Sequence, residues 1–116
     1  MNTKIAKNNR RKGHQWERDV IKRLRALGIR CETSRFASRK TDDAKVDVFI
    51  EDGTALNIQC KCHNAFKNVA PVLAEMPEDN NYNIVLMKVQ RDNAYAILTV
   101  DDFFEILGML KSNDIL

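Results

Sequence analysis

The stretch from Val46 to His63 constrains the fold most, because it contains two strand-like segments joined by a short polar turn. The first segment, Val46–Ile50, is mostly apolar and β-branched, and the second, Leu56–His63, alternates apolar and polar residues. Between them, Glu51-Asp52-Gly53-Thr54 contains Asp-Gly, a pair favoured in tight hairpin turns. The sequence therefore predicts an antiparallel hairpin.

The alternation along this hairpin sorts its side chains onto two faces, because successive residues of a strand point in opposite directions. In the second strand one face is apolar, and the other carries Asn57, Gln59, Lys61 and His63. If Asp47 of the first strand faces the same way, a carboxylate, an amide oxygen and an ammonium group converge. This arrangement predicts a metal site with a cation beside it.

Regular elements are expected on both sides of the hairpin. A helix is predicted from about His14 to Leu27, with Gly28 as its stop signal, followed by a short strand at 29–33. After the hairpin the pattern predicts four more elements: a short helix at 69–76, strands at 82–89 and 94–100 that form a second hairpin, and a helix at 103–111 whose apolar residues give it a packing face. With 116 residues, the chain is expected to be one domain over 13–116, preceded by a flexible basic arm over 1–12.

Glu17 interrupts the apolar stripe of the first predicted helix. The stripe contains Trp16, Val20, Ile21, Leu24 and Leu27, and Glu17 falls within it when residues are placed at 100° intervals. A carboxylate in such a position is costly unless it has a partner. Two interpretations stay open: a glutamate at the edge of the stripe that reaches solvent, and one that points to the sheet and shares a cation with Asp47.

Positive charge is concentrated in the first part of the chain. Residues 1–45 hold fourteen Lys and Arg against five Asp and Glu, a balance of +9, whereas the whole chain has a net charge of +3. A basic half favours a polyanionic partner, with nucleic acid as the leading candidate, and a solvated helix face is the simpler alternative. The candidate nucleic-acid-binding residues lie in the basic arm and in the polar loop before the hairpin: Arg10, Arg11, Lys12, Ser34, Arg35, Ser38, Arg39 and Lys40.

Composition excludes several classes of protein. No apolar run is long enough to span a membrane, and the polar N-terminus lacks the apolar segment of a signal peptide, so an intracellular, cytoplasmic protein is expected, in the host cytoplasm if it is viral. The three cysteines are expected to be reduced. They and His63 are enough in number for a zinc site, but Cys60 and Cys62 share a strand face from which His63 points away, and this spacing argues against zinc.

At this point the chain resembles the PD-(D/E)xK nuclease superfamily, and within it the small endonucleases that resolve Holliday junctions. Three short motifs carry the resemblance: Lys12-Gly13-His14-Gln15-Trp16-Glu17, Lys45-Val46-Asp47-Val48 and Ile58-Gln59-Cys60-Lys61. They cover roughly residues 10–63, and the order of the elements extends the resemblance to about residue 100. The fold it implies is α/β, with a restriction-endonuclease-like αβββαβ core, a mixed central sheet flanked by helices and a C-terminal helix.

The resemblance implies a Mg²⁺-dependent endonuclease that hydrolyses phosphodiester bonds of branched DNA during recombination. Glu17, Asp47, Gln59 and Lys61 would be the catalytic residues. Asp47, Gln59 and Glu17 would hold Mg²⁺, with Mn²⁺ as a substitute, and Lys61 would orient the attacking water. The family resemblance also implies a homodimer, with the C-terminal helix or the second hairpin as the interface, and no membrane association.

The chain departs from the family pattern at two positions. Val46 replaces the proline that gives the motif its name, and Gln59 stands where an acidic residue is usual. An amide oxygen coordinates Mg²⁺ but adds no negative charge, so the site should hold metal less tightly. A non-catalytic nucleic-acid-binding protein on the same fold is therefore the alternative, and a small structural or regulatory protein is a third interpretation.

Overall fold

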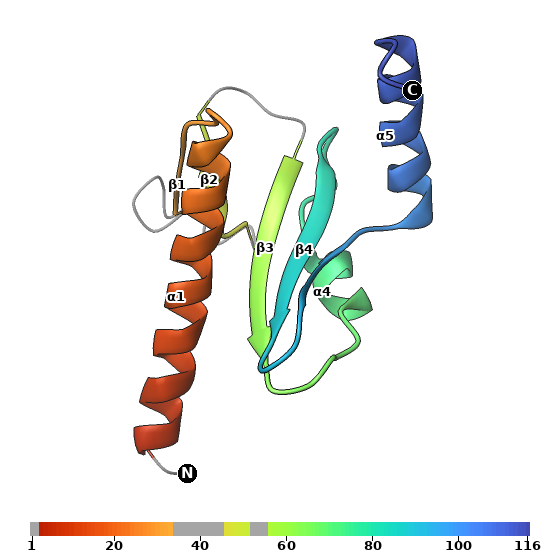
Figure 1. Cartoon of the computed structure of the whole chain (residues 1–116). Helices are drawn as coiled ribbons and strands as arrows, with labels where there is room; N and C mark the ends of the chain where they lie inside the picture. Colours follow the sequence, from red (N-terminus) through yellow and green to blue (C-terminus); the bar gives the residue numbers. More distant parts are fainter. Residues whose placement is uncertain (1–2, 34–45, 52–55) are drawn as a thin grey trace.

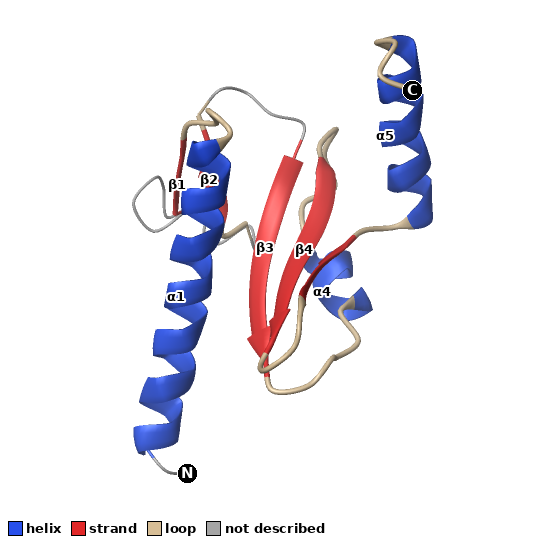
Figure 2. Cartoon of the chain, viewed as in Figure 1, coloured by secondary structure: helices blue, strands red, loops and turns tan. Residues whose placement is uncertain are grey.

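A five-stranded mixed sheet forms the centre of the molecule (Figures 1 and 2), as seen in a computed structural model that describes residues 3–33, 46–51 and 56–116. The strands follow one another in the sheet in chain order: β1 (Cys31–Thr33), β2 (Val48–Ile50), β3 (Leu56–His63), β4 (Tyr82–Val89) and β5 (Ala94–Ile97). Neighbouring strands are antiparallel except β3 and β4, which are parallel along their whole length. The expected α/β class with a mixed sheet is confirmed.

Helices cover both faces of this sheet. The long α1 (Thr3–Ala26) packs on one face, and the short α4 (Ala70–Glu75) packs on the other, in the crossover that a parallel pair of strands requires (Figure 1). The last helix, α5 (Val100–Ser112), extends away beyond β5 (Figure 2). Among the described helices, none is both long and apolar enough to cross a lipid bilayer.

Both predicted hairpins are present. Val48 of β2 faces Ile58 of β3 in an antiparallel pair, and Lys88 of β4 faces Ala94 of β5 in another. The predicted turn at 52–54 lies outside the described residues. Strand β1 begins at Cys31 rather than at residue 29, and β5 ends at Ile97 because Thr99 already caps the next helix.

Helix α1 begins at Thr3, well before the predicted start at His14, so residues 3–12 form its first turns instead of an irregular arm. Lys, Arg and Ala are good helix formers, but this segment has no apolar stripe, and periodicity therefore gave no signal for it. The predicted stop is confirmed. Gly28 adopts a positive φ of 84°, its N–H donates to the Arg25 carbonyl at 2.9 Å, and the Ile29 N–H donates to the Leu24 carbonyl at 3.1 Å.

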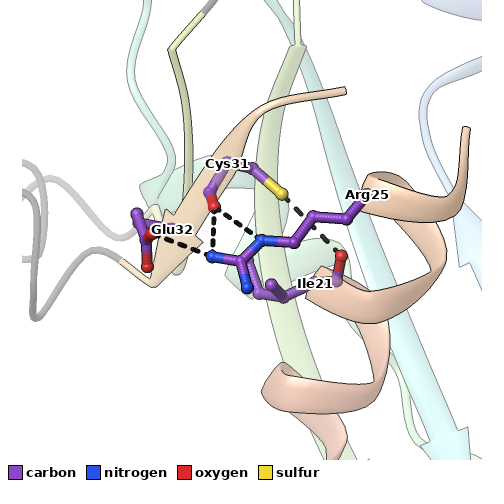
Figure 3. A network of polar contacts seen from close by, with 4 residues as sticks. All are labelled: Ile21, Arg25, Cys31 and Glu32. Atoms are coloured by element: carbon purple, nitrogen blue, oxygen red, sulfur yellow. Dashed lines mark hydrogen bonds and ion pairs between the residues drawn. The ribbon is translucent and has the colours of Figure 1, made fainter. Parts of the chain in front are cut away.

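Two contacts fix α1 on the sheet. Near its middle, the buried Trp16 indole donates a hydrogen bond to the Leu86 carbonyl of β4 at 3.0 Å. At its end, the Arg25 guanidinium bonds the Cys31 carbonyl at 2.9 Å and the Glu32 carboxylate at 2.8 Å, which ties the helix to β1 (Figure 3). The helix is therefore held at points on both sides of β3.

The apolar side chains of α5, unlike those of α1, do not pack on the sheet. Thr99 caps this helix by accepting a hydrogen bond from the Asp102 N–H at 3.2 Å, so it begins at Val100 rather than at residue 103. The helix contains no buried residue. Its predicted packing face exists, but within the described part of the chain it does not join either hydrophobic core.

Candidate functional site

Strand β3 places its two predicted site residues, Gln59 and Lys61, on one face of the sheet and apolar residues on the other. Ile58 and Cys60 belong to the hydrophobic cluster beneath α1. Gln59 lies beside Val85 of β4, a member of the cluster beneath α4, and Lys61 follows on the same face. The predicted polar stripe is therefore present, and it faces α4.

Asp47 lies in the plane of the sheet, beside Gln59. Its N–H donates to the carbonyl of Ile58 at 2.8 Å, and its Oδ2 accepts from the N–H of Cys60 at 2.7 Å. These two partners are the residues before and after Gln59. The carboxylate thus replaces a backbone carbonyl as the partner of Cys60, which places a half-buried negative charge where β2 meets β3.

Glu17 reaches the same region from α1. Burial raises the pKa of the Cys60 thiol, and the negative charges of Asp47 and Glu17 raise that pKa further. Both carboxylates therefore act on one buried atom, although thirty residues of chain separate them. Glu17 is half-buried, so both interpretations of this residue, at the edge of the stripe or directed to the sheet, stay open.

Gln59 carries an unsatisfied acceptor. The residue is 7% exposed, and its side-chain oxygen Oε1 is buried without a hydrogen-bond partner among the described residues. Leaving a buried polar atom unpaired costs about 1–3 kcal/mol, so native proteins rarely retain one without a reason. A cation or a donor group reaching this oxygen would remove the cost.

Lys61 lies further along the stripe, next to His63. Burial, together with the positive charges of Lys67 and Lys61, lowers the pKa of His63. Lys61 and Gln59 face α4, whereas Glu17 approaches from the α1 face, and Asp47 lies between them. The structure thus brings the charges of Glu17 and Asp47 within electrostatic reach of Cys60, and it bonds Asp47 to the residues on either side of Gln59. It does not place all four predicted residues on one face.

The donor set for a metal ion is correspondingly small. In residues 3–33, 46–51 and 56–116, no three His, Cys, Asp or Glu side chains gather in a way that could hold a metal ion. The predicted ligands are two carboxylates, Glu17 and Asp47, and the amide of Gln59. Because Gln is not one of these four residue types, the predicted set could not form such a group of three. Two carboxylates and an orphaned amide oxygen are chemically suited to Mg²⁺, which prefers oxygen ligands.

A strongly basic surface runs along α1. All nine of its Lys and Arg residues are exposed, and at 24 residues the helix is about 36 Å long. The predicted Arg10, Arg11 and Lys12 belong to this surface. A shallow cavity of about 360 Å³ is lined by Lys7, Arg10, Arg11, His14 and Arg18. The other predicted nucleic-acid contacts, Ser34, Arg35, Ser38, Arg39 and Lys40, lie outside the described residues.

Thr33 is a candidate that the sequence did not reveal. It is 6% exposed, and its hydroxyl has no hydrogen-bond partner in the described part of the chain. It lines a cavity of about 230 Å³ together with Arg18, Lys22 and Arg25 of the basic helix. A threonine in a strand is ordinary in sequence, so only the structure identifies it.

Comparisons with known proteins do not assign the chain to a family: no protein-family description, curated protein or solved structure matches it.

Proposed function

We propose that this protein is a metal-dependent endonuclease that cleaves DNA, with branched DNA as its substrate and a restriction-endonuclease-like core as its fold. The observation that carries the proposal is the position of Asp47. It is hydrogen-bonded to Ile58 and Cys60, the residues on either side of Gln59. Its negative charge, like that of Glu17, also raises the pKa of the Cys60 thiol. The order of strands, with β3 and β4 parallel, agrees with that core.

Asp47 is the central residue of the proposed site. Asp47 and Gln59 would hold Mg²⁺ where β2 meets β3, and Glu17, which approaches from the α1 face, would add negative charge to the site. When bound, Mg²⁺ would polarise the scissile phosphate and lower the pKa of a coordinated water molecule. The buried Gln59 oxygen supports this assignment, because a cation would supply the partner that it lacks among the described residues.

Lys61 and the basic helix would act on the nucleic acid. Lys61 is a half-buried residue of β3, and its ammonium group would orient water and offset the negative charge that develops on the phosphate. The exposed cations of α1 would contact phosphates without reading sequence, as expected for an enzyme that recognises branched structure. A homodimer would present two such sites to two strands.

Cleavage of a labelled four-way junction, with linear duplex and single strand as comparisons, tests this proposal in Mg²⁺, in Mn²⁺ and in EDTA. The informative variant is Asp47→Asn, because an amide oxygen still accepts the hydrogen bond from Cys60 while the charge is lost. We expect metal-dependent cutting that falls by about 100-fold or more in this variant, exceeding the 10–100-fold effect of second-shell changes at metal sites.

The matched control is Asp114→Asn, the same change at an exposed turn position near the C-terminus. It should leave cutting unchanged. Equal cutting by wild type and Asp47→Asn would refute the proposed site, and cutting in EDTA would refute the metal requirement.

A non-catalytic nucleic-acid-binding protein is the second candidate. The exposed cations of α1 favour this candidate, because they could bind phosphates even if Asp47 held no metal ion. It predicts junction binding that weakens steeply with salt, without cutting in either metal.

A further inference from the structure

The cavity of about 230 Å³ between α1 and β1, here called the α1/β1 cavity, has a lining that is mostly polar and charged. It is lined by Arg18, Ile21, Lys22, Arg25, Glu32 and Thr33. Three of these side chains are cations and one is a carboxylate, so positive charge is in excess. An anion is therefore the kind of ligand that the cavity favours.

Thr33 supplies a buried polar group at the wall of this cavity. It is the last residue of β1 and is 6% exposed. Cys31, two residues earlier, belongs to the hydrophobic cluster beneath α1, and alternation along the strand places Thr33 on the same face. The Thr33 hydroxyl has no hydrogen-bond partner among the described residues. Native proteins pair almost all such groups, so this hydroxyl is suited to a ligand that accepts its hydrogen bond.

The three cations of the cavity differ in how they are bound. The Arg25 guanidinium donates to the Glu32 carboxylate at 2.8 Å, and this ion pair neutralises one positive charge (Figure 3). Arg18 donates to the neutral side-chain oxygen of Gln15 at 2.9 Å, and Lys22 has no ion-pair partner in the described part of the chain. Because Arg18 and Lys22 are four residues apart, they lie on the same side of the helix. Two positive charges thus remain beside the buried hydroxyl.

We propose that the α1/β1 cavity binds a phosphate group, which accepts a hydrogen bond from the Thr33 hydroxyl and is held by the charges of Arg18 and Lys22. Guanidinium and ammonium groups are the side chains that most often recognise phosphate. A terminal phosphate has three strong acceptor oxygens, enough for all three donors at once, whereas a carboxylate has two.

The register of the sheet relates this cavity to the proposed metal site. Thr33 pairs with Val48, the residue after Asp47, and neighbouring strands lie about 4.7–4.9 Å apart. The cavity is therefore one strand away from Asp47, where a second phosphate of a bound strand would position the substrate. A nucleic-acid backbone is thus the favoured source of the phosphate. That step rests on the proposed function, but phosphate binding itself does not.

Thr33→Val tests the hydroxyl, because valine keeps the branched shape of threonine without its hydrogen-bonding group. Fluorescence anisotropy with a labelled four-way junction in EDTA measures affinity without cleavage. We expect the variant to bind about 10-fold more weakly, the effect of losing one hydrogen bond to a charged group. Its urea midpoint should be unchanged or higher, because the free protein loses no bond. Ser112→Ala, which removes an exposed hydroxyl from the end of α5, is the matched control and should bind as wild type does.

Lys22→Gln provides a second test, on the charge of the cavity. Lys22 is exposed on a helix, so the variant should fold as wild type does. The slope of log K against log salt for the junction should fall by about 1, as expected when one phosphate contact is lost. Lys111→Gln, the same change on α5, should leave the slope unchanged.

Titration with inorganic phosphate, followed through the backbone NMR signals of Thr33 and Lys22, separates the two sources of phosphate. Both signals should shift in wild type and stay in place in Thr33→Val. For a nucleic-acid phosphate, the junction should cause these shifts at a concentration about 100-fold lower than inorganic phosphate does, because the rest of α1 adds contacts. The reverse order would assign the cavity to a free phosphate compound.

Junction affinity and phosphate-induced shifts that are both unchanged in Thr33→Val would overturn the proposal. So would a lower urea midpoint for this variant, because the hydroxyl would then have a bond within the free protein. A junction that binds as described but is never cut would support the phosphate site and refute the proposed function alone.

Discussion

Helices α1 and α5 are both amphipathic, but only α1 buries its apolar stripe. Trp16 is 6% exposed in α1, whereas Phe104 is 64% exposed in α5. The difference follows from what each helix contacts, since α1 packs on β1 and β3 while α5 leaves the sheet after β5 (Figure 1).

The comparison shows that an amphipathic pattern predicts an apolar contact but not its partner. In α1 the contact is intramolecular and positions Glu17 beside the sheet. In α5 the apolar face has no such contact within the described part of the chain. Changes to α1 should therefore affect folding and the site, and changes to α5 should affect them little.

The largest expected effect on stability is that of Trp16→Ala. Removing a buried tryptophan costs about 3–5 kcal/mol, and this one also donates a hydrogen bond to the Leu86 carbonyl. Urea unfolding of the two proteins, followed by far-UV circular dichroism, measures the difference. A loss below about 1 kcal/mol would mean that α1 is not held as described, since typical single changes already cost that much.

Removal of three cations from α1 should have the next largest effect, on nucleic-acid binding. In Arg10→Ala/Arg11→Ala/Lys12→Ala, the slope of log K against log salt should fall by about 1 for each phosphate that the protein no longer neutralises. Fluorescence anisotropy with a labelled junction over a series of salt concentrations provides this slope. Lys111→Ala on α5 is the control, and an equal change in slope there would show that charge in general, rather than α1, sets the affinity.

Phe103→Ala on α5 should barely change the stability of the monomer. The side chain is 46% exposed in a helix without buried residues, and surface substitutions usually change the free energy of unfolding by about 0.5 kcal/mol or less. Thermal unfolding of wild type and the variant measures this effect. A loss as large as that of Trp16→Ala would show that α5 packs within its own chain.

The smallest expected effect is a change in the pH dependence of stability, and it concerns His63. This residue is at the end of β3, on the same face as Gln59 and Lys61. Its pKa is lowered below the ordinary value of 6.5 by burial and by Lys67 and Lys61. The unfolded chain therefore takes up a proton more readily, and stability falls as pH drops from 6.5 through the folded pKa. His63→Gln should make the stability profile flatter in that window and leave it unchanged above it. An identical acid-side slope in both proteins would contradict the assignment.

The sequence predicted the sheet well where its patterns were local. The hairpin of β2 and β3, the second hairpin and the stop at Gly28 all depend on alternation and turn chemistry within a few residues. The start of α1 at Thr3 was not predicted, because its first turns are rich in Lys and Arg. These residues favour a helix, but they do not form the apolar stripe that indicates a buried helix face. The exposure of the apolar face of α5 could not be predicted, because the pattern shows that a helix has an apolar face but not whether the rest of the chain covers it.

The candidate site was predicted only in part. Alternation correctly placed Gln59 and Lys61 on one face of β3, opposite Ile58 and Cys60. It could not reveal that the Asp47 carboxylate bonds the Cys60 N–H within the sheet, because that geometry depends on how β2 begins. Nor could it reveal that the Thr33 hydroxyl has no partner among the described residues, which depends on burial.

Direct measurement of Mn²⁺ binding by electron paramagnetic resonance tests the central claim, that Asp47 organises a metal site beside Gln59 where β2 meets β3. Wild type and Asp114→Asn should bind one ion per chain, and Asp47→Asn should lose that binding while keeping the fold through its amide oxygen. Equal binding by Asp47→Asn, or no binding by wild type, would contradict the account.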